Sequence, residues 1–420
     1  MPRYLARFAV FVFAVCAAQL RAEVISTHCE ESEVSLDGLY SVSRLERCGD
    51  ADADALLWHL DRIDQIGSGL DGYVDRGNGG AGSVIYVMDT GVMASHTEFT
   101  TNDYRRPMGQ PGASRVIAGY DATSSVEIGR SRCTSPDKSV APCFDRVDEL
   151  AAASHGTSVA SIAAGRKIGV APSALVVSIR VMNERGLATT RTYLEGLEAI
   201  IRHAWDPSSP NARTAVVNIS GWVLERLSNT SNTDPVAYAT VEQKMREMIG
   251  GVDSNGRRNP NGKRFLFVVA ANNIDGGCGS SGVIDRFPAL LGTKTDGLIT
   301  VGGMTADNTT WSGSCHGGVE VLAPAQSIFS ATITAADHYR GRRPNLRSGT
   351  SFAAPIIAGI AARLLSDRPD LTPQQLESWI TATPSRVYDP SAPMADGRVA
   401  YVRSIAPAAM TSSSRAAMKP

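Results

Sequence analysis

The chain has 420 residues, of which 43% are hydrophobic and 20% charged, so it can bury the core of one large domain. Its formal net charge of -1 shows no excess of basic residues of the kind that binds nucleic acid. We therefore expect one main globular domain and no nucleic-acid partner.

The first residues, 1–22, have the pattern of a secretory signal peptide. Arg3 and Arg7 precede an apolar run at residues 8–18, and small residues follow as cleavage candidates. A membrane anchor is the weaker alternative, because the run is shorter than the roughly 20 residues that cross a bilayer. We predict a secreted, extracellular protein that has no membrane contact once the signal is removed.

The cysteines fit an oxidising compartment. Six of the seven lie beyond the signal, and an even number in a secreted chain indicates disulfides. A zinc site is the rival interpretation, but the paired C-x-x-C spacing is missing. Six cysteines allow many pairings, and proximity in the sequence favours Cys29–Cys48, Cys133–Cys143 and Cys278–Cys315.

Residues 23–54 are polar and acidic, and we interpret them as a short N-terminal extension or a reduced propeptide. From residue 55 the pattern becomes apolar runs that alternate with helical ones. Near-continuous apolar runs are typical of parallel strands that are covered on both faces. We predict strands at 83–89, 174–182, 214–220, 264–271 and 298–303, and helices at 155–165, 189–205 and 235–251.

This alternation predicts an α/β fold at residues 55–403, a doubly wound, mostly parallel sheet with helices on both faces. Three long polar segments are expected to be loops, at 101–150, 252–263 and 333–347. The tail at 404–420 is small and polar, and we expect it to be disordered.

Three residues of catalytic type stand at the ends of these elements. Asp89 ends a predicted strand in "VIYVMDTGV", His155 opens a helix in "SHGTSVASIAAG", and Ser351 opens a helical pattern in "RSGTSFAAP". Each alone has a structural alternative, because Asp-Thr-Gly can be a turn and serine is a common helix cap. Their joint occurrence in the order Asp, His, Ser favours a catalytic triad.

These motifs, together with "VVNIS" and "FVVAANN", resemble the subtilisin-like serine peptidases, and most closely their proteinase K branch, over roughly residues 55–385. The resemblance implies that Asp89 orients His155, which acts as general base for the nucleophile Ser351. It also implies that Asn273 donates its amide to the oxyanion, whereas Asn272 fits the role of a turn residue better.

The sequence departs from the family at the strand that lines the substrate pocket. Ser220, Gly221 and Trp222 occupy this position in "VVNISGWV", and the family usually has glycine where Trp222 stands. The indole either narrows or fills the pocket, which would favour small side chains or shut the cleft, or it turns outward. Residues 23–54 are also short for the family's propeptide.

The resemblance adds weight to the Cys278–Cys315 pair, which would brace the oxyanion loop. The chemistry itself requires no cofactor. Structural calcium is common in the family, but no loop has a self-sufficient ligand motif, so no metal ligand is assigned.

The predicted function is that of a secreted, monomeric serine endopeptidase, which cleaves protein or peptide substrates through an acyl-enzyme on Ser351. The alternative is an exported, catalytically restricted pseudoenzyme or binding protein with the same fold. An α/β-hydrolase esterase is excluded by chain order, because its histidine must follow the serine and no histidine follows Ser351.

Overall fold

The structure is a computed structural model, and the described part of the chain has gaps. It comprises residues 31–36, 40–45, 57–64, 70, 73–94, 96–99, 114–125, 154–183, 185–205, 214–223, 235–253, 255–259, 261–275, 277–279, 281–333, 339–340, 343–382 and 399. The predicted signal peptide, the tail at 404–420 and the cysteines at 29, 48, 133 and 143 lie outside these residues.

A seven-stranded sheet forms the centre of the molecule, in the order β10-β9-β8-β7-β4-β6-β5. Every neighbouring pair in it is parallel. The strands are β4 (Val84–Asp89), β5 (Val116–Asp121), β6 (Leu175–Arg180), β7 (Thr214–Ile219), β8 (Arg264–Ala270), β9 (Leu298–Met304) and β10 (Val321–Pro324).

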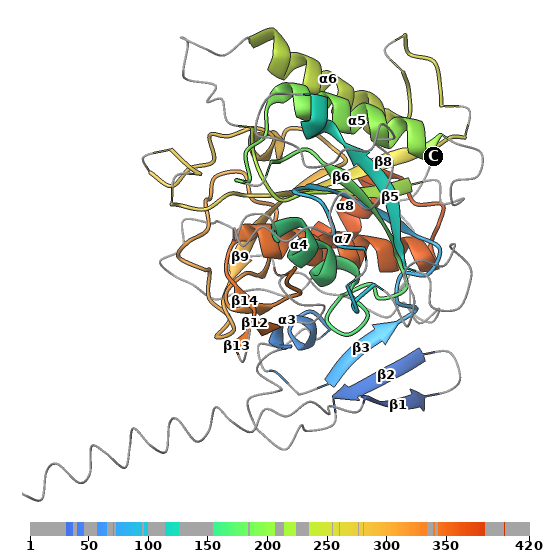
Figure 1. The fold of residues 1–420 in the computed structure, drawn as a ribbon, viewed down its shortest axis with the longest axis vertical. Helices are drawn as coiled ribbons and strands as arrows, with labels where there is room; N and C mark the ends of the chain where they lie inside the picture. The colour runs from blue at the N-terminus through green and yellow to red at the C-terminus, as the bar shows by residue number, and fades with distance from the viewer. Residues whose placement is uncertain are drawn as a thin grey trace, which may run out of the picture.

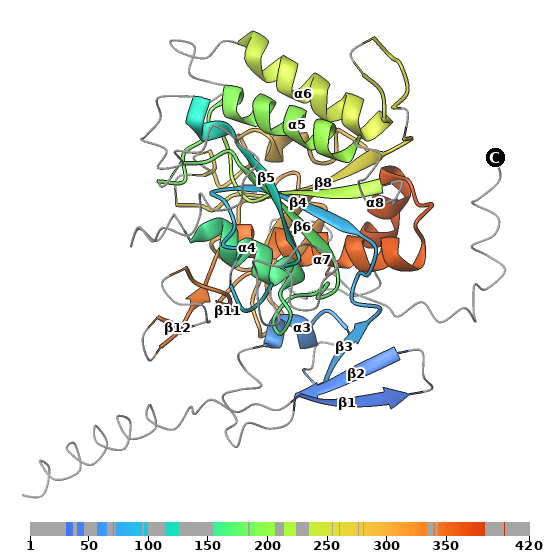
Figure 2. The same cartoon turned by 45° about the vertical axis from the view of Figure 1, so that its right-hand side comes forward.

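Helices cover both faces of this sheet (Figure 1 and Figure 2). On one face α4 (His155–Ala164), α7 (Thr350–Asp367) and α8 (Pro373–Thr381) pack against strand side chains such as Ile85 and Val268. On the other face α5 (Thr190–Ala204) and α6 (Pro235–Gly250) pack against side chains such as Met88 and Phe267. Both faces of the strands are therefore buried, which explains their near-continuous apolar sequences.

The predicted fold class is confirmed, and the five predicted strands and three predicted helices occur within about two residues of their expected bounds. The sequence analysis missed β5, which lies inside the predicted loop at 101–150. This strand contains Gly119, and a Cβ there would stand 1.5 Å from the Ser178 carbonyl oxygen. Close backbone approach thus requires a glycine that weakens the strand pattern.

Two further elements of the sheet region were not predicted. The four residues of β10 end in Pro324, so the apolar run is too short to identify a strand. The helix α8 could have been predicted from the sequence, because Thr372 and Gln375 form a capping box and Pro373 stands at the first helical position.

A smaller antiparallel sheet lies beside the N-terminal end of the large sheet (Figure 2). It contains β1 (Glu31–Leu36), β2 (Tyr40–Leu45) and β3 (Tyr73–Gly77), with the short helix α3 (Trp58–Asp61) next to β3. The segment at 23–54 therefore contributes two strands to the described structure. Whether it is an extension or a propeptide stays a prediction.

Short elements complete the fold. The predicted loop at 333–347 contains three two-residue strands, and single 3-10 turns follow β5 and precede β9. These are β11 (Ile328–Phe329), β12 (Tyr339–Arg340), β13 (Arg343–Pro344), β14 (Leu346–Arg347), η2 (Ala122–Ser125) and η4 (Ala289–Leu291). Within the described residues, no helix combines the length and apolar character that spanning a bilayer requires.

Candidate active site

Asp89 and His155 meet at the carboxyl edge of the large sheet. Asp89 ends β4, is fully buried, and has its two carboxylate oxygens 2.8 and 3.0 Å from His155 Nδ1. A carboxylate only accepts hydrogen bonds, so Nδ1 carries the proton and Nε2 keeps its lone pair. The His155 side chain is 24% exposed, which leaves the ring accessible to a substrate. This pair can therefore act as an oriented general base.

Thr90 and Gly156 fix the distance between the strand and the helix that carry this pair. The Thr90 amide donates to Asp89 Oδ1 at 2.7 Å, and the Thr90 hydroxyl accepts from the Gly156 amide at 3.0 Å. A Cβ on Gly156 would stand 2.3 Å from the Gly91 carbonyl oxygen, which is too close for any other residue. Glycine after the histidine thus allows α4 to start against the end of β4.

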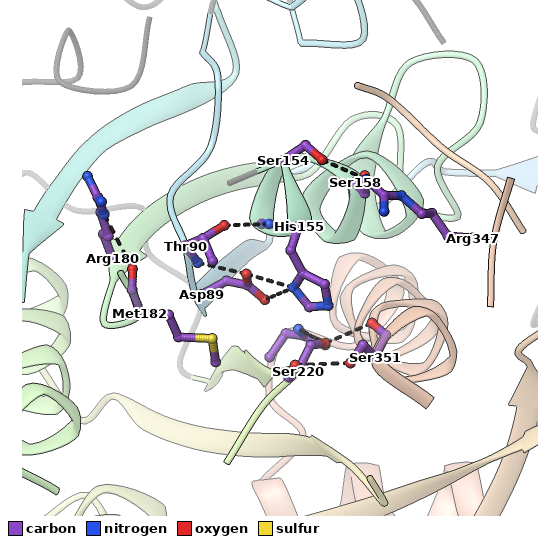
Figure 3. Close-up of polar contacts among 12 residues, drawn as sticks. Asp89, Thr90, Ser154, His155, Ser158, Arg180, Met182, Ser220, Arg347 and Ser351 are labelled. Carbon is purple, nitrogen blue, oxygen red and sulfur yellow. Dashed lines mark hydrogen bonds and ion pairs between the residues drawn. The ribbon is translucent and has the colours of Figure 1, made fainter. Parts of the chain in front are cut away.

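Ser351 lies in the first turn of α7, on the other side of the His155 ring from Asp89 (Figure 3). The Phe352 ring contacts the imidazole, with ring centroids 5.4 Å apart. The Ser351 hydroxyl donates to the Ser220 carbonyl at 3.1 Å, and the Ser220 hydroxyl donates to the Ser351 carbonyl at 2.9 Å. In this rotamer the hydroxyl faces Ser220, and rotation about its Cα–Cβ bond is needed to turn it toward Nε2.

The Asn273 amide is held in one orientation beside Ser351. Its Oδ1 accepts from the Thr350 amide at 3.0 Å and from the Thr350 hydroxyl at 3.1 Å. Because the oxygen is engaged, Nδ2 is the group directed at Gly349, whose Cβ position would stand 3.3 Å from it. Gly349 has φ +151°, a conformation that favours glycine. A donor therefore points at the region in front of the serine.

Asn272 has a different environment from its neighbour. Its φ of +72° is left-handed, and its side chain is buried. Its carbonyl accepts from the Cys315 amide at 3.0 Å, and Cys315 forms a disulfide with Cys278, with a Cα–Cα distance of 6.0 Å. Asn tolerates this backbone conformation better than most residues, so Asn272 fits a turn residue. The disulfide joins the segment just after Asn273 to Cys315, whose amide bonds Asn272.

The segment after β7 carries the three predicted pocket residues. A Cβ on Gly221 would stand 2.1 Å from Met182 Cε and 4.0 Å from the Tyr193 hydroxyl. Trp222 is half-buried, and the guanidinium carbon of Arg286 lies 5.4 Å from its ring centroid. The indole is therefore held against a buried cation at the edge of the site.

Sequence reasoning missed the residues that support this site. Thr90 could have been found, because it follows Asp89 within the Asp-Thr-Gly motif. Tyr193 gives no such signal: it lies on α5, is fully buried, and its hydroxyl has no hydrogen-bond partner. Burial, and secondarily the charge of Asp89, raise the pKa of Tyr193, so it stays a neutral phenol.

Metal binding has no candidate in the part of the chain that the structure describes. Groups of three or more His, Cys, Asp or Glu side chains that could hold an ion do not occur there. We therefore assign no metal ligand among these residues.

The chain belongs to the subtilase family, whose family model matches residues 80–405. The family predicted from the motifs is thereby confirmed. The matched region contains the large sheet and all four residues around the candidate site, Asp89, His155, Asn273 and Ser351.

Curated relatives are similar over most of this chain. Alkaline serine exoprotease A of Vibrio alginolyticus is 27% identical over 371 residues, which are 87% of this chain and 53% of the relative. The extracellular serine proteinase of Thermus sp. (strain Rt41A) is 29% identical over 333 residues, 79% of this chain and 62% of the relative. The chain thus spans between about half and two thirds of the length of these two proteins.

A solved structure shares the fold. The crystal structure of a cold adapted subtilisin-like serine proteinase aligns with a TM-score of 0.57 and 24% identity, and the match covers 82% of this chain and 98% of that one. Proteinase R of Parengyodontium album, a further relative, is 24% identical over 355 residues, 84% of this chain and 70% of its own.

Proposed function

We propose that the protein is a secreted serine endopeptidase that hydrolyses protein and peptide substrates with Asp89, His155 and Ser351. The observation that carries this proposal is the 2.8 Å contact between His155 Nδ1 and the buried Asp89, with Ser351 beyond the ring. A serine hydroxyl is a weak nucleophile until an oriented imidazole accepts its proton.

The reaction follows from the positions of the donors and acceptors. After rotation of its side chain, Ser351 Oγ attacks the scissile carbonyl carbon while His155 Nε2 takes the proton. The carbonyl oxygen becomes an oxyanion, which accepts from Asn273 Nδ2 and from the Ser351 amide, because an amide in the first turn of α7 has no acceptor within the helix.

Collapse of this intermediate releases the first product. His155 Nε2 returns the proton to the departing amine, the peptide C–N bond breaks, and the acyl group remains on Ser351. A water molecule then attacks the ester carbonyl while His155 Nε2 takes its proton. The bond to Ser351 Oγ breaks, His155 returns the proton to this oxygen, and the second peptide leaves with a new carboxylate. Asp89 stabilises the imidazolium in both halves of the reaction, and this chemistry requires no cofactor.

The proposal of an extracellular location rests on three observations. Residues 1–22 have the composition of a signal peptide, and Cys278 and Cys315 are paired as expected in an oxidising compartment. The Thermus relative is an extracellular proteinase by its printed name. We propose that the secreted enzyme acts as a monomer.

A fluorophosphonate probe tests the nucleophile directly. The purified full chain should become labelled on Ser351, and labelling should disappear in Ser351→Ala and in His155→Ala. Ser348→Ala is a matched control, because this exposed serine lies on the same segment and its hydroxyl accepts from the Ser327 amide at 2.9 Å. An unlabelled, folded protein would contradict the peptidase and support the alternative of a binding protein with a restricted site.

Trp222 gives the proposal its substrate class. The Arg286 guanidinium contacts the Trp222 ring and holds it beside the segment that follows β7. We therefore propose that the indole narrows the substrate pocket, so that the residue before the scissile bond must have a small side chain. Trp222→Gly should raise kcat/KM for peptides with a large residue there by about ten- to a hundredfold. An unchanged preference would show that the indole lies away from the substrate.

A further inference from the structure

Asn218 is a buried polar residue in a largely apolar row of the large sheet. It lies in β7 and pairs in register with Val87 of β4 and Val268 of β8, so the three side chains share a face. Both valines belong to the core beneath α4 and α7. Asn218 is fully buried there, and its Oδ1 has no hydrogen-bond partner among the described residues. Burying an amide in this way costs stability, so valine would suit this position better for folding alone.

The Asn218 side chain begins a short series of hydrogen bonds that ends at the nucleophile. Its Nδ2 donates to the Ser220 hydroxyl at 3.0 Å, and this hydroxyl donates to the Ser351 carbonyl at 2.9 Å. Figure 3 shows Ser220 lying directly beside Ser351. A hydroxyl has one proton and two lone pairs. Because Asn218 donates to a lone pair of the Ser220 oxygen, the Ser220 proton remains free for the Ser351 carbonyl.

Pro355 explains why the Ser351 carbonyl is open to this donor. In a regular α-helix the carbonyl of residue 351 accepts from the amide of residue 355. Proline has no amide hydrogen, and Pro355 lies inside α7. The regular helix bond to the Ser351 carbonyl is therefore missing, and the Ser220 hydroxyl replaces it.

The backbone before Ser351 is held by a side chain as well. The Thr350 amide donates to Asn273 Oδ1 at 3.0 Å. With the Ser351 carbonyl also engaged, the main chain of the nucleophile is fixed on both sides of its Cα atom. The hydroxyl then has to move only by rotation about the Cα–Cβ bond to reach His155. This matters because a small misplacement of a reacting group lowers the rate steeply.

We propose that Asn218 is a positioning residue, which acts through the Ser220 hydroxyl to hold the Ser351 main chain in place for attack. This inference rests on the proposed function and deepens it. The alternative is that Asn218 and Ser220 only stabilise the packing of α7 on the sheet. The two roles differ in what they change, since a packing role affects stability, whereas a positioning role affects the rate of the folded enzyme.

Asn218→Val tests the proposal, because valine fills the site, suits a strand and cannot donate. We expect kcat per titrated active site to fall by about ten- to a hundredfold, with KM nearly unchanged. The rate constant for labelling by the fluorophosphonate should fall by the same factor, since this small reagent needs the serine but no bound peptide. The unfolding temperature should be unchanged or higher, because no unpaired amide oxygen remains buried.

Ser178→Ala is the matched control. Ser178 pairs with Val87 from β6, so it lies in the same row and on the same face as Asn218. It is buried, and its hydroxyl has no partner in the part of the chain that the structure describes. Its replacement should leave kcat and the labelling rate unchanged. An equal loss of rate in this variant would show that any change to the row slows the enzyme, and would overturn a specific role of Asn218.

A double-variant cycle tests whether the effect passes through the Ser351 carbonyl. Pro355→Ala supplies an amide hydrogen to that carbonyl, so Ser220→Ala should cost less rate in this background than in the unchanged chain. Asn218→Val should add little to Ser220→Ala, because the two residues act in series. Losses in kcat that multiply in either pair would overturn the inference.

The remaining outcomes separate this inference from the proposed function. An Asn218→Val variant that unfolds at a lower temperature but turns over normally per titrated site has lost packing alone, which would overturn the inference and leave the peptidase intact. Should this variant not fold, Asn218→Ala is measured in the same way. If the unchanged chain neither cleaves peptides nor reacts with the fluorophosphonate, the proposed function is wrong, and this inference with it.

Discussion

The two edges of the large sheet use carboxyl groups in opposite ways. At the carboxyl edge, Asp89 faces the imidazole of His155, a group of the opposite charge type. At the amino edge, Glu320 precedes β10 and faces Glu377 of α8, a second acid. An acid beside a base can stay charged, whereas two acids in contact are stable only while they share a proton.

The amino edge is bound together through these two acids. The Thr300 amide donates to Glu320 at 2.9 Å, and the Gly297 amide donates to Glu377. Burial and then the contact with Glu377 raise the pKa of the Glu320 carboxyl to about 8. Burial also raises the pKa of Glu377, and Asp296 acts in the same direction. The shared proton therefore joins α8 to the starts of β9 and β10.

This difference teaches that one sheet separates chemistry from stability. Changes to Ser351, His155 or Asn273 at the carboxyl edge should alter the rate and leave the fold intact, because we propose that these side chains contact the substrate. Changes at the amino edge should alter the stability and its pH dependence and leave the rate intact, since Glu320 and Glu377 lie beside the starts of β9 and β10, at the opposite end of the strands from Ser351. The four predictions below test this separation, and stability is best measured in a Ser351→Ala background that prevents self-digestion.

The largest effect should come from the triad. Ser351→Ala and His155→Ala should each lower kcat by about a million-fold, and the double variant should be no slower, because the residues act as one unit. Thermal unfolding should stay within a few degrees of the unchanged chain. If the losses in kcat of the two single variants instead add up in the double variant, Ser351 and His155 do not act as one catalytic unit.

The next effect separates the two asparagines. Asn273→Ala should lower kcat by about two to three orders of magnitude with KM nearly unchanged, because its Nδ2 contacts the oxyanion mainly in the transition state. Asn272→Ala is the matched control: it should reduce stability more than rate, because its left-handed backbone is strained for alanine. If Asn272→Ala loses turnover and Asn273→Ala does not, then Asn272 and not Asn273 is the oxyanion donor.

The disulfide should connect rate and stability at the carboxyl edge. Cys278 and Cys315 close a loop with a sequence separation of 37, so replacing both by serine should lower the free energy of unfolding by about 2–4 kcal/mol. Because the Cys315 amide donates to the Asn272 carbonyl, next to Asn273, and Cys278 follows on the same segment, kcat should fall too, though less than in Asn273→Ala. Denaturant unfolding and steady-state kinetics measure the two effects. A variant with full stability would show that the loop is braced by its hydrogen bonds alone.

The smallest effect concerns pH at the amino edge. A carboxyl whose pKa is raised on folding stabilises the fold below its ordinary pKa, and this stabilisation is lost as the pH rises toward the folded value. The free energy of unfolding should therefore decline between about pH 5 and about pH 8, as the Glu320–Glu377 pair loses its proton.

Glu320→Gln tests this decline, because glutamine imitates the protonated acid. The variant should unfold at a higher temperature than the unchanged chain near pH 8 and show a flatter pH profile, with kcat/KM unaffected. Glu242→Gln is the matched control, since this half-exposed residue of α6 pairs with Arg246. A profile in Glu320→Gln as steep as in the unchanged chain would show that other groups set the pH dependence.

Much of the fold could be predicted because its signals are local. The strands β4, β6, β7, β8 and β9 are near-continuous apolar runs, and α5 begins at a capping box on Thr189. The exceptions have physical reasons. Position 119 in β5 must be glycine because the Ser178 carbonyl of β6 lies too close for a side chain, and this glycine weakens the strand pattern. In β1 and β2 apolar residues alternate with polar ones, and the polar composition of residues 23–54 hid this alternation.

The sequence by itself determined the family and the candidate residues Asp89, His155, Asn273 and Ser351, because each lies in a short motif whose residue types are dictated by local geometry and chemistry. Only the tertiary structure decided that Asp89 contacts Nδ1, that Thr350 turns the Asn273 amide, and that Arg347 reaches Ser154. It also brought Glu320 to Glu377. These contacts join residues far apart in the chain. Long-range packing determines which residues meet, and a short sequence motif contains no information about that packing.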